Sequence, residues 1–270
     1  MIHFAFFGTD EFSLGVLEEL LKHGLTPSLL VTAPTHVIHT YADAESIPSL
    51  QPTSLKEVPH ELAQEPWDLF VVASYGKIIP QSILNLPTHG TLNVHPSLLP
   101  LYRGPSPIES TILSGDRETG VTIMLVDSEV DHGHIVAQER CVLTGTEYYP
   151  DLAMELAERG GKLLAETIPP WIAGTLTTRT QDHTHASYTK KIKAEDGLIE
   201  LDGNAVENYR KVRAYLPWPK AFYLHQKEST QIRVAITRAH VDTEGNFVID
   251  RVIPAGKREM PYSDFLRGLR

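Results

Sequence analysis

The stretch Ile2-His3-Phe4-Ala5-Phe6-Phe7-Gly8-Thr9-Asp10-Glu11 decides the fold class, because it joins an apolar run to the start of a helix. The run before Gly8 is typical of a strand that is buried on both faces of a parallel sheet. Thr9 or Asp10 is expected to cap the following helix, with Glu11 in its first turn. The helix is expected to end at Gly24 and to face the core with Val16, Leu17, Leu20 and Leu21.

Further apolar runs along the first part of the chain predict additional strands, separated by helical patterns. The expected strands are Ser28–Thr32, Leu69–Ser74, Gly90–Val94 and Val121–Val126. A long helix is expected over Asp151–Thr167, with Pro169-Pro170 stopping it. Alternation of strands and helices predicts an α/β domain with a mostly parallel, Rossmann-like sheet.

The pattern changes after residue 172. Residues 173–187 are rich in Thr, His and Gly without periodicity, so an interdomain linker is expected there. We therefore predict a catalytic domain over residues 1–185 and a small domain over residues 186–270. For the second domain we expect a helix over Ala205–Tyr215 and strands over Ala221–His225, Gln231–His240 and Asn246–Ile253. One helix with three antiparallel strands suggests a small β-barrel of the oligonucleotide-binding (OB-like) type.

Composition narrows the class of protein. The chain has 270 residues, of which 41% are hydrophobic and 21% charged, as in an ordinary globular protein. Cys141 is the single cysteine, so no intrachain disulfide forms; this fits a reducing cytosol, and we expect a cytoplasmic protein without a membrane span or metal site. Residues 1–185 carry a net charge of −14 and residues 186–270 carry +4. That asymmetry favours a polyanionic partner for the second domain, although small domains also differ in charge by chance.

Polar side chains that could act together in catalysis lie at the end of the strand Gly90–Val94. Asn93 and His95 are two residues apart at a strand end, so their side chains point to the same side. A carboxamide beside an imidazole can stabilise negative charge on a carbonyl oxygen that becomes tetrahedral. Asp131 follows a later strand, where its carboxylate could approach His95, stabilise its charged form and accept a proton. A buried, hydrogen-bonded His95 without a catalytic role fits the same pattern. No nucleophile accompanies the three, which favours direct transfer between two bound substrates.

The motif Asn93–Gly104 resembles the formyltransferase family that uses 10-formyltetrahydrofolate, and within it the members that formylate methionyl-tRNA. The resemblance extends over nearly the whole chain. It is carried also by Phe6–Phe12, Ser74–Pro80, Thr119–Met124, Asp131-x-Gly133, Lys191–Gly197, Arg213–Pro219 and Asp264–Gly268.

The resemblance implies that Asn93, His95 and Asp131 are catalytic, with Asn93 and charged His95 stabilising the oxyanion while Asp131 holds His95. It implies 10-formyltetrahydrofolate as formyl donor and no metal. The folate would lie near Ser97, Leu98, Leu99, Pro100, Tyr75, Ile78 and Ile79. The implied reaction formylates initiator methionyl-tRNA for translation initiation, by an enzyme expected to be a monomer.

The acceptor has alternatives, because family members acting on methionyl-tRNA carry a basic insertion after the second strand. Residues 32–45 stand at that place and contain no Lys or Arg; His36 and His39 are poor substitutes for arginine at a phosphate. A formyltransferase for a nucleotide-linked amino sugar is the alternative, and a non-catalytic folate- or RNA-binding module is a further one. Arg103 is expected to meet a phosphate or substrate carboxyl, or to be a solvated surface residue.

Aromatic residues alternate with basic ones in the second domain, which suits contact with an RNA backbone. An interdomain core with a solvated rim fits the same cluster, and Trp218, between two prolines, is expected in that core. The residues are Arg210, Lys211, Arg213, Tyr215, Trp218, Lys220, Phe222 and Tyr223.

Overall fold

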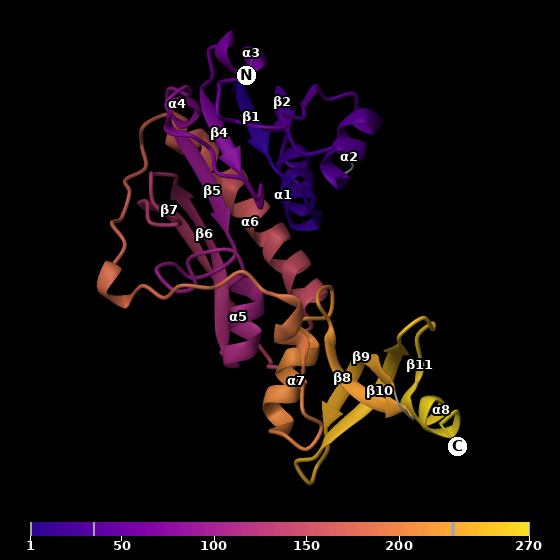
Figure 1. Cartoon of the computed structure of the whole chain (residues 1–270). Coiled ribbons are helices and arrows are strands. Elements are labelled where there is room, and N and C mark those ends of the chain that lie inside the picture. Colours follow the sequence, from indigo (N-terminus) through magenta and orange to yellow (C-terminus); the bar gives the residue numbers. More distant parts are fainter. Residues whose placement is uncertain (1, 35, 228–229, 270) are drawn as a thin grey trace. The chain divides into compact units, whose positions relative to one another are not determined.

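The structure is a computed structural model that describes residues 2–34, 36–227 and 230–269 (Figure 1). The chain forms two compact units. One comprises Met1–Pro107, Glu118–Val142 and Ala153–Thr189; the other comprises Ile108–Arg117, Leu143–Leu152 and Lys190–Arg270. The predicted domain boundary between residues 185 and 186 stays a prediction.

The first unit is built on a seven-stranded sheet of order β3-β2-β1-β4-β5-β6-β7. The five strands from β3 to β5 are parallel, while β6 and β7 are antiparallel additions beside β5. The predicted mostly parallel α/β sheet is therefore confirmed. The strands are β1 (Phe4–Phe7), β2 (Leu29–Val31), β3 (Ser49–Leu50), β4 (Leu69–Val72), β5 (Thr91–His95), β6 (Glu118–Leu125) and β7 (Ile135–Val142).

Two of these strands had no counterpart in the prediction. Strand β3 is only two residues long, too short for any periodicity. Strand β7 contains Gln138, Glu139 and Arg140 and is half exposed, because it lies at the sheet edge with one neighbouring strand. Its sequence therefore lacks the continuous apolar run of a central strand.

The first helix begins and ends as the sequence predicts. Helix α1 (Glu11–Lys22) has Asp10 as N-cap, whose carboxylate accepts from the Ser13 amide while the Ser13 hydroxyl accepts from the Asp10 amide. Gly24 follows the helix with φ 75°, a conformation that favours glycine. This capping box fixes the turn that leaves the C-terminal end of β1.

The other helices of the chain's first 172 residues are α2 (Val37–Glu45), α3 (His60–Ala63), α4 (Gln81–Leu84), α5 (Pro107–Ser114) and α6 (Tyr149–Ile172). The prediction that Pro169-Pro170 stops α6 is wrong, because the helix continues to Ile172. Proline lacks an N–H but keeps its carbonyl, and the Pro169 and Pro170 carbonyls accept from the amides of Ala173 and Thr175. The last turn therefore closes without the two missing donors.

Helix α6 packs directly on the strand that carries Asn93 and His95. A Cβ atom added to Gly160 would lie 2.7 Å from Cγ1 of Val94, so only glycine allows this approach. An aromatic cluster fills the sheet nearby, with the Phe7 and Phe70 rings 5.2 Å apart and Tyr75 edge-on to Phe7 at 5.4 Å. The carboxyl ends of β1, β4 and β5 are thereby held on a rigid base.

The second unit contains an antiparallel sheet of order β11-β10-β9-β8. Over the described residues the ladder is open between β8 and β11, so the small antiparallel β domain is present as an open four-stranded sheet. Val212, Val234, Ile236 and Val252 are fully buried in its core. Its elements are η2 (Ala194–Gly197), α7 (Ala205–Ala214), β8 (Ala221–Lys227), β9 (Thr230–Val241), β10 (Phe247–Pro254), β11 (Met260–Pro261) and α8 (Tyr262–Arg267).

Trp218 does not pack in the hydrophobic core of the second unit. It is 54% exposed, whereas Tyr215 and Tyr223 are buried. Pro217 and Pro219 flank Trp218 in a turn that ends before β8, so the indole projects from the surface. None of the helices in the described ranges is long and apolar enough to span a membrane.

Candidate active site

The side chains of Asn93 and His95 project from the C-terminal end of β5 on one face of the sheet. Asn93 pairs in register with Val72 of β4 and Met124 of β6, and His95 pairs with Thr122. The two residues therefore lie at the point where parallel pairing gives way to antiparallel pairing. Irregular loops leave the sheet here, and such loops carry function in α/β proteins.

His95 is oriented by the loop that follows it. Its side chain is 5% exposed, and Nε2 lies 2.9 Å from the carbonyl oxygen of Tyr102. A carbonyl oxygen only accepts, so we assign the hydrogen to Nε2. In the neutral ring, Nδ1 then carries the lone pair, and it lies 3.6 Å from Oδ2 of Asp131.

Asp131 reaches His95 from the loop between β6 and β7. Its backbone has φ 50°, a left-handed conformation that costs energy for a residue with a Cβ. The amide of Gly104 donates to Oδ2 of Asp131 at 2.7 Å. Two residues later, a Cβ on Gly133 would lie 1.9 Å from the carbonyl oxygen of Leu125, so the turn admits only glycine there.

The structure thus brings His95 and Asp131 together and places Asn93 one strand repeat before His95. The His95 ring thus lies between the Tyr102 carbonyl oxygen and the Asp131 carboxylate. At 3.6 Å the imidazole and carboxylate are too far apart for a direct hydrogen bond, which leaves Nδ1 available to a reacting group. The arrangement suits proton transfer beside a carbonyl carbon.

Residues 97–100, predicted as a folate contact, form a loop fastened to β6. The Ser97 hydroxyl is fully buried and donates to the Leu101 carbonyl at 2.6 Å. Thr122 donates to the Ser97 carbonyl at 2.6 Å and accepts from the Leu99 amide at 3.2 Å. Gln138 donates to the Leu99 carbonyl at 3.0 Å. The Ser97 side chain is thus bonded within the protein and the Leu99 side chain is buried, while Pro100 is half-buried.

Leu98 is half-buried. It lines a cavity of about 400 Å³ together with Ile135, Gln138, Thr177 and Arg179. The cavity lies along the edge strand β7, where Arg179 pairs by its backbone with Ile135.

The second predicted folate wall, after β4, divides into buried and exposed residues. Tyr75 is 3% exposed and Ile79 is half-buried, and both pack against the aromatic cluster under β1. Ile78 is 91% exposed. Burial raises the pKa of Tyr75 to about 12, so its hydroxyl remains a donor. Within the described part of the chain that hydroxyl is buried without a hydrogen-bond partner.

Arg103 is neither solvated nor open to a substrate phosphate, which corrects both expectations for it. Its side chain is 1% exposed. The guanidinium donates to Oε1 of Gln181 at 2.6 and 3.1 Å, to Nδ1 of His183 at 2.8 Å and to the Tyr188 hydroxyl at 3.1 Å. These neutral acceptors satisfy the buried cation.

Two side-chain partners of Arg103, Gln181 and His183, come from the predicted linker over residues 173–187, and the third, Tyr188, follows it directly. Gln181 is 3% exposed, and the 3-10 helix η1 (His183–His185) follows it. Ser187 and Thr189 extend the contact, because the Arg103 amide donates to the Ser187 carbonyl and the Thr189 amide donates to the Arg103 carbonyl. Residues 181–189 have no hydrophobic periodicity, so the sequence did not indicate that they contact Arg103. Their polar side chains are the feature that pointed to such a contact.

Within residues 2–34, 36–227 and 230–269, no group of three or more His, Cys, Asp or Glu side chains is arranged to hold a metal ion.

Comparison with known proteins bears on the same chain segments. Residues 22–168 match the formyl transferase family, and residues 191–247 match the formyl transferase C-terminal domain. A methionyl-tRNA formyltransferase of Roseiflexus sp. (strain RS-1) is 40% identical over 245 residues, covering 83% of this chain and 75% of the relative. Another, from Halalkalibacterium halodurans, is 33% identical over 297 residues, covering 97% and 93%.

Solved structures share the fold. A methionyl-tRNA formyltransferase from Clostridium thermocellum has a TM-score of 0.65 at 19% identity, covering 94% of this chain and 99% of that one. An N-formyltransferase from Helicobacter canadensis, in complex with folinic acid and dTDP-3-aminofucose, has a TM-score of 0.66 at 19% identity, covering 90% and 89%. With curated relatives at 33–40% identity over most of their length, the chain belongs to the formyl transferase family.

Proposed function

We propose that this enzyme transfers the formyl group of 10-formyltetrahydrofolate to the amino group of initiator methionyl-tRNA, and so serves translation initiation. The curated relatives that align over most of the chain at 33–40% identity carry the name methionyl-tRNA formyltransferase. The observation that carries the chemistry is the His95–Asp131 pair at the end of β5, with Asn93 on the same face of the strand.

In the proposed reaction the neutral amine attacks the formyl carbon, and the electron pair of the C=O bond moves onto oxygen. Asn93 and protonated His95 donate to that oxyanion, His95 through Nδ1 because Nε2 is engaged by Tyr102. Asp131 accepts the proton that the attacking nitrogen loses. Cleavage of the bond between the formyl carbon and N10 restores the carbonyl, and N10 takes up a proton, so no net proton is consumed.

For the folate we propose the residues that the resemblance implied: Ser97, Leu98, Leu99, Pro100, Tyr75, Ile78 and Ile79. The fit rests on two features. Loop 97–100 is held rigidly by Thr122 and Gln138, which suits recognition through backbone groups. Tyr75 has a buried hydroxyl without a protein partner in the described residues, a feature that a polar ligand atom would satisfy.

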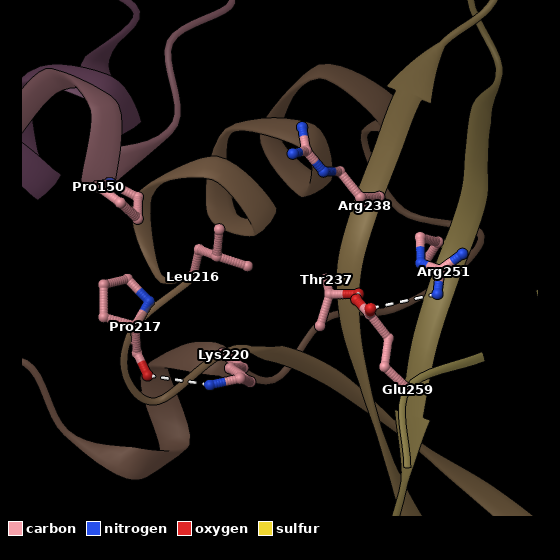
Figure 2. Close-up of a pocket in the computed structure, with 8 residues that line it drawn as sticks. All are labelled: Pro150, Leu216, Pro217, Lys220, Thr237, Arg238, Arg251 and Glu259. Carbon is pink, nitrogen blue, oxygen red and sulfur yellow. Dashed lines mark hydrogen bonds and ion pairs between the residues drawn. The ribbon is translucent and has the colours of Figure 1, made fainter. Parts of the chain in front are cut away.

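The second unit is our candidate for RNA contact. It holds a cavity of about 570 Å³ whose lining includes Lys220, Arg238, Arg251 and Glu259 (Figure 2). A hydrogen bond from Thr237, with help from Arg251, lowers the pKa of Glu259, so the lining carries one ionised carboxylate and three cationic side chains. The excess positive charge suits a phosphate backbone.

The predicted basic and aromatic cluster contributes only in part to this surface. Lys220 lines the cavity, and Trp218 is 54% exposed nearby in sequence. Arg213 is instead buried, donates to the Glu147 carbonyl and stacks on the Tyr209 ring. We therefore propose RNA contact through the exposed members and a structural role for Arg213.

The segment after β2 remains the feature that separates acceptors. The alignment with the Halalkalibacterium relative spans 297 positions, more than this chain's 270 residues, so that relative has insertions that this chain lacks. Residues 37–45 form the short helix α2, which contains no Lys or Arg. A nucleotide-linked amino sugar stays the alternative acceptor for this reason.

The test is formyl transfer from 10-formyltetrahydrofolate to charged initiator methionyl-tRNA, followed for wild type, Asn93→Ala and Asp131→Ala. We expect transfer in wild type and a loss of about 10²-fold or more in each variant. No transfer to tRNA, with transfer to a nucleotide-linked amino sugar, would establish the alternative acceptor. Folate binding without transfer to either would leave a binding module.

Ionic strength distinguishes the acceptors independently. Binding of methionyl-tRNA is expected to weaken steeply with salt, whereas a sugar nucleotide with few phosphates would weaken mildly. We further propose that the enzyme acts as a monomer in the cytoplasm; sedimentation at assay concentration tests the first part, and cell fractionation the second.

A further inference from the structure

We propose that Gln181 is a positioning residue for Asp131, and that the segment around it is a working part of the active site. This inference rests on the proposed function, because Asp131 is catalytic only within that reaction. Gln181 touches neither His95 nor the reacting atoms, so it acts through Asp131.

The carboxamide of Gln181 is used completely. Its Oε1 accepts two hydrogen bonds from Arg103, at 2.6 and 3.1 Å. Its Nε2 donates to the carbonyl oxygen of Asp131 at 2.9 Å and to that of Gly133 at 2.7 Å. The oxygen and the nitrogen of one buried side-chain amide thus connect the Arg103 guanidinium to the turn 131–133.

These bonds close a ring through the catalytic carboxylate. Arg103 precedes Gly104, whose amide donates to Oδ2 of Asp131 at 2.7 Å. The backbone carbonyl of Asp131 is therefore connected through Gln181 to the Arg103 side chain. The carboxylate of Asp131 is bonded to the amide of Gly104, the residue after Arg103. The dipeptide Arg103-Gly104 thus holds Asp131 at its backbone carbonyl, through Gln181, and at its carboxylate, directly.

This ring of hydrogen bonds holds an uncommon backbone conformation. Asp131 has φ 50°, in the left-handed region that residues with a Cβ seldom adopt, Asp and Asn being the commonest exceptions. Two hydrogen bonds from Gln181 to carbonyls on either side of His132 hold the turn in this shape. Without them, the carboxylate would leave its position 3.6 Å from Nδ1 of His95.

Arg103 is itself anchored independently of Gln181. His183 and Tyr188 accept from it, and its backbone pairs with residues 187–189. Loss of the Gln181 amide donors therefore leaves Arg103 in place, and the effect is confined to the turn 131–133.

Gln181→Glu is the sharpest variant. Glutamate has the same shape and gives Arg103 a charged acceptor. It has no N–H to donate to the carbonyls of Asp131 and Gly133. Gln181→Met is the second variant, because it is neutral and lacks both bonds, and Gln64→Glu on the exposed end of α3 is the matched charge control.

We expect Gln181→Glu to lower kcat about 10²-fold, as a displacement of about 1 Å does, with KM for both substrates within threefold of wild type. Gln64→Glu is expected to match wild type. In an Asp131→Ala background, Gln181→Glu should cost no further activity, because it acts through Asp131. A purely structural role would instead lower the melting temperature, raise KM and add to the Asp131→Ala loss.

A second measurement is independent of the reaction. Hydrogen exchange at the Gly104 amide reports its bond to Asp131, and we expect Gln181→Glu to accelerate it at least tenfold while Gln64→Glu leaves it unchanged. If wild type does not formylate methionyl-tRNA, the proposed function fails, and this exchange rate alone decides the positioning. Unchanged exchange, or unchanged kcat in an active enzyme, overturns the inference.

Discussion

Replacement of Gly133 by alanine tests the close packing beneath the turn that carries Asp131. The new Cβ would lie 1.9 Å from the Leu125 carbonyl oxygen, about 1.5 Å inside the 3.4 Å at which ordinary contact begins. Leu125 is the last residue of β6 and its amide is bonded to the His134 carbonyl, so the strand end resists movement. The turn containing Asp131 must therefore shift by more than 1 Å.

The magnitude follows from that shift. A 1 Å misplacement of a catalytic group costs about 10²-fold in rate, equivalent to about 2.7 kcal/mol of transition-state stabilisation. Overpacking adds a loss of about 1–3 kcal/mol in unfolding free energy. We expect kcat for methionyl-tRNA formylation to fall about 10²-fold at a temperature where urea titration shows that the variant is folded.

The control is Gly268→Ala in the second unit. Gly268 has φ −76°, and its new Cβ would make ordinary contact, 3.6 Å from the Asp264 carbonyl oxygen. This variant should match wild type in kcat and stability. Wild-type kcat in folded Gly133→Ala would refute the reasoning, because it would mean that Asp131 need not be held where the structure places it.

Three further predictions concern groups around the same site. Thr122→Val removes the hydroxyl that donates to the Ser97 carbonyl and accepts from the Leu99 amide, so KM for 10-formyltetrahydrofolate should rise about tenfold. Thr122→Ser keeps the hydroxyl and should stay close to wild type. Equal KM values for the two variants would contradict this prediction. Tyr75 has its pKa raised to about 12 by burial, so its ionisation favours unfolding, and stability should fall as pH rises from about 10 to 12. Tyr75→Phe should flatten that fall in urea titrations, and an unchanged slope would count against it. Phe70→Ala empties a fully buried position and should cost about 3–5 kcal/mol in unfolding free energy, whereas Phe70→Leu should cost clearly less; a loss below 1 kcal/mol would show that the core collapses around the gap.

Local signals were sufficient for the central elements of the fold. Strand β1 and helix α1 appear where the apolar run and the Asp10 cap predict them, because both depend on residues adjacent in sequence. Strand β7 and the last turn of α6 did not follow local rules. The first is polar because it lies at an edge, and the second accommodates Pro169 and Pro170 through carbonyls that later amides satisfy.

The candidate site divides along the same line. Sequence alone determined that Asn93 and His95 share a face, since two residues apart on a strand is a local relation, and the motif named Asp131. Only the tertiary structure decided that Asp131 meets His95 at 3.6 Å, that Arg103 is buried, and that Gln181, 78 residues later, joins them. Hydrogen bonds between distant segments depend on how the chain packs, and no periodicity along the sequence records them.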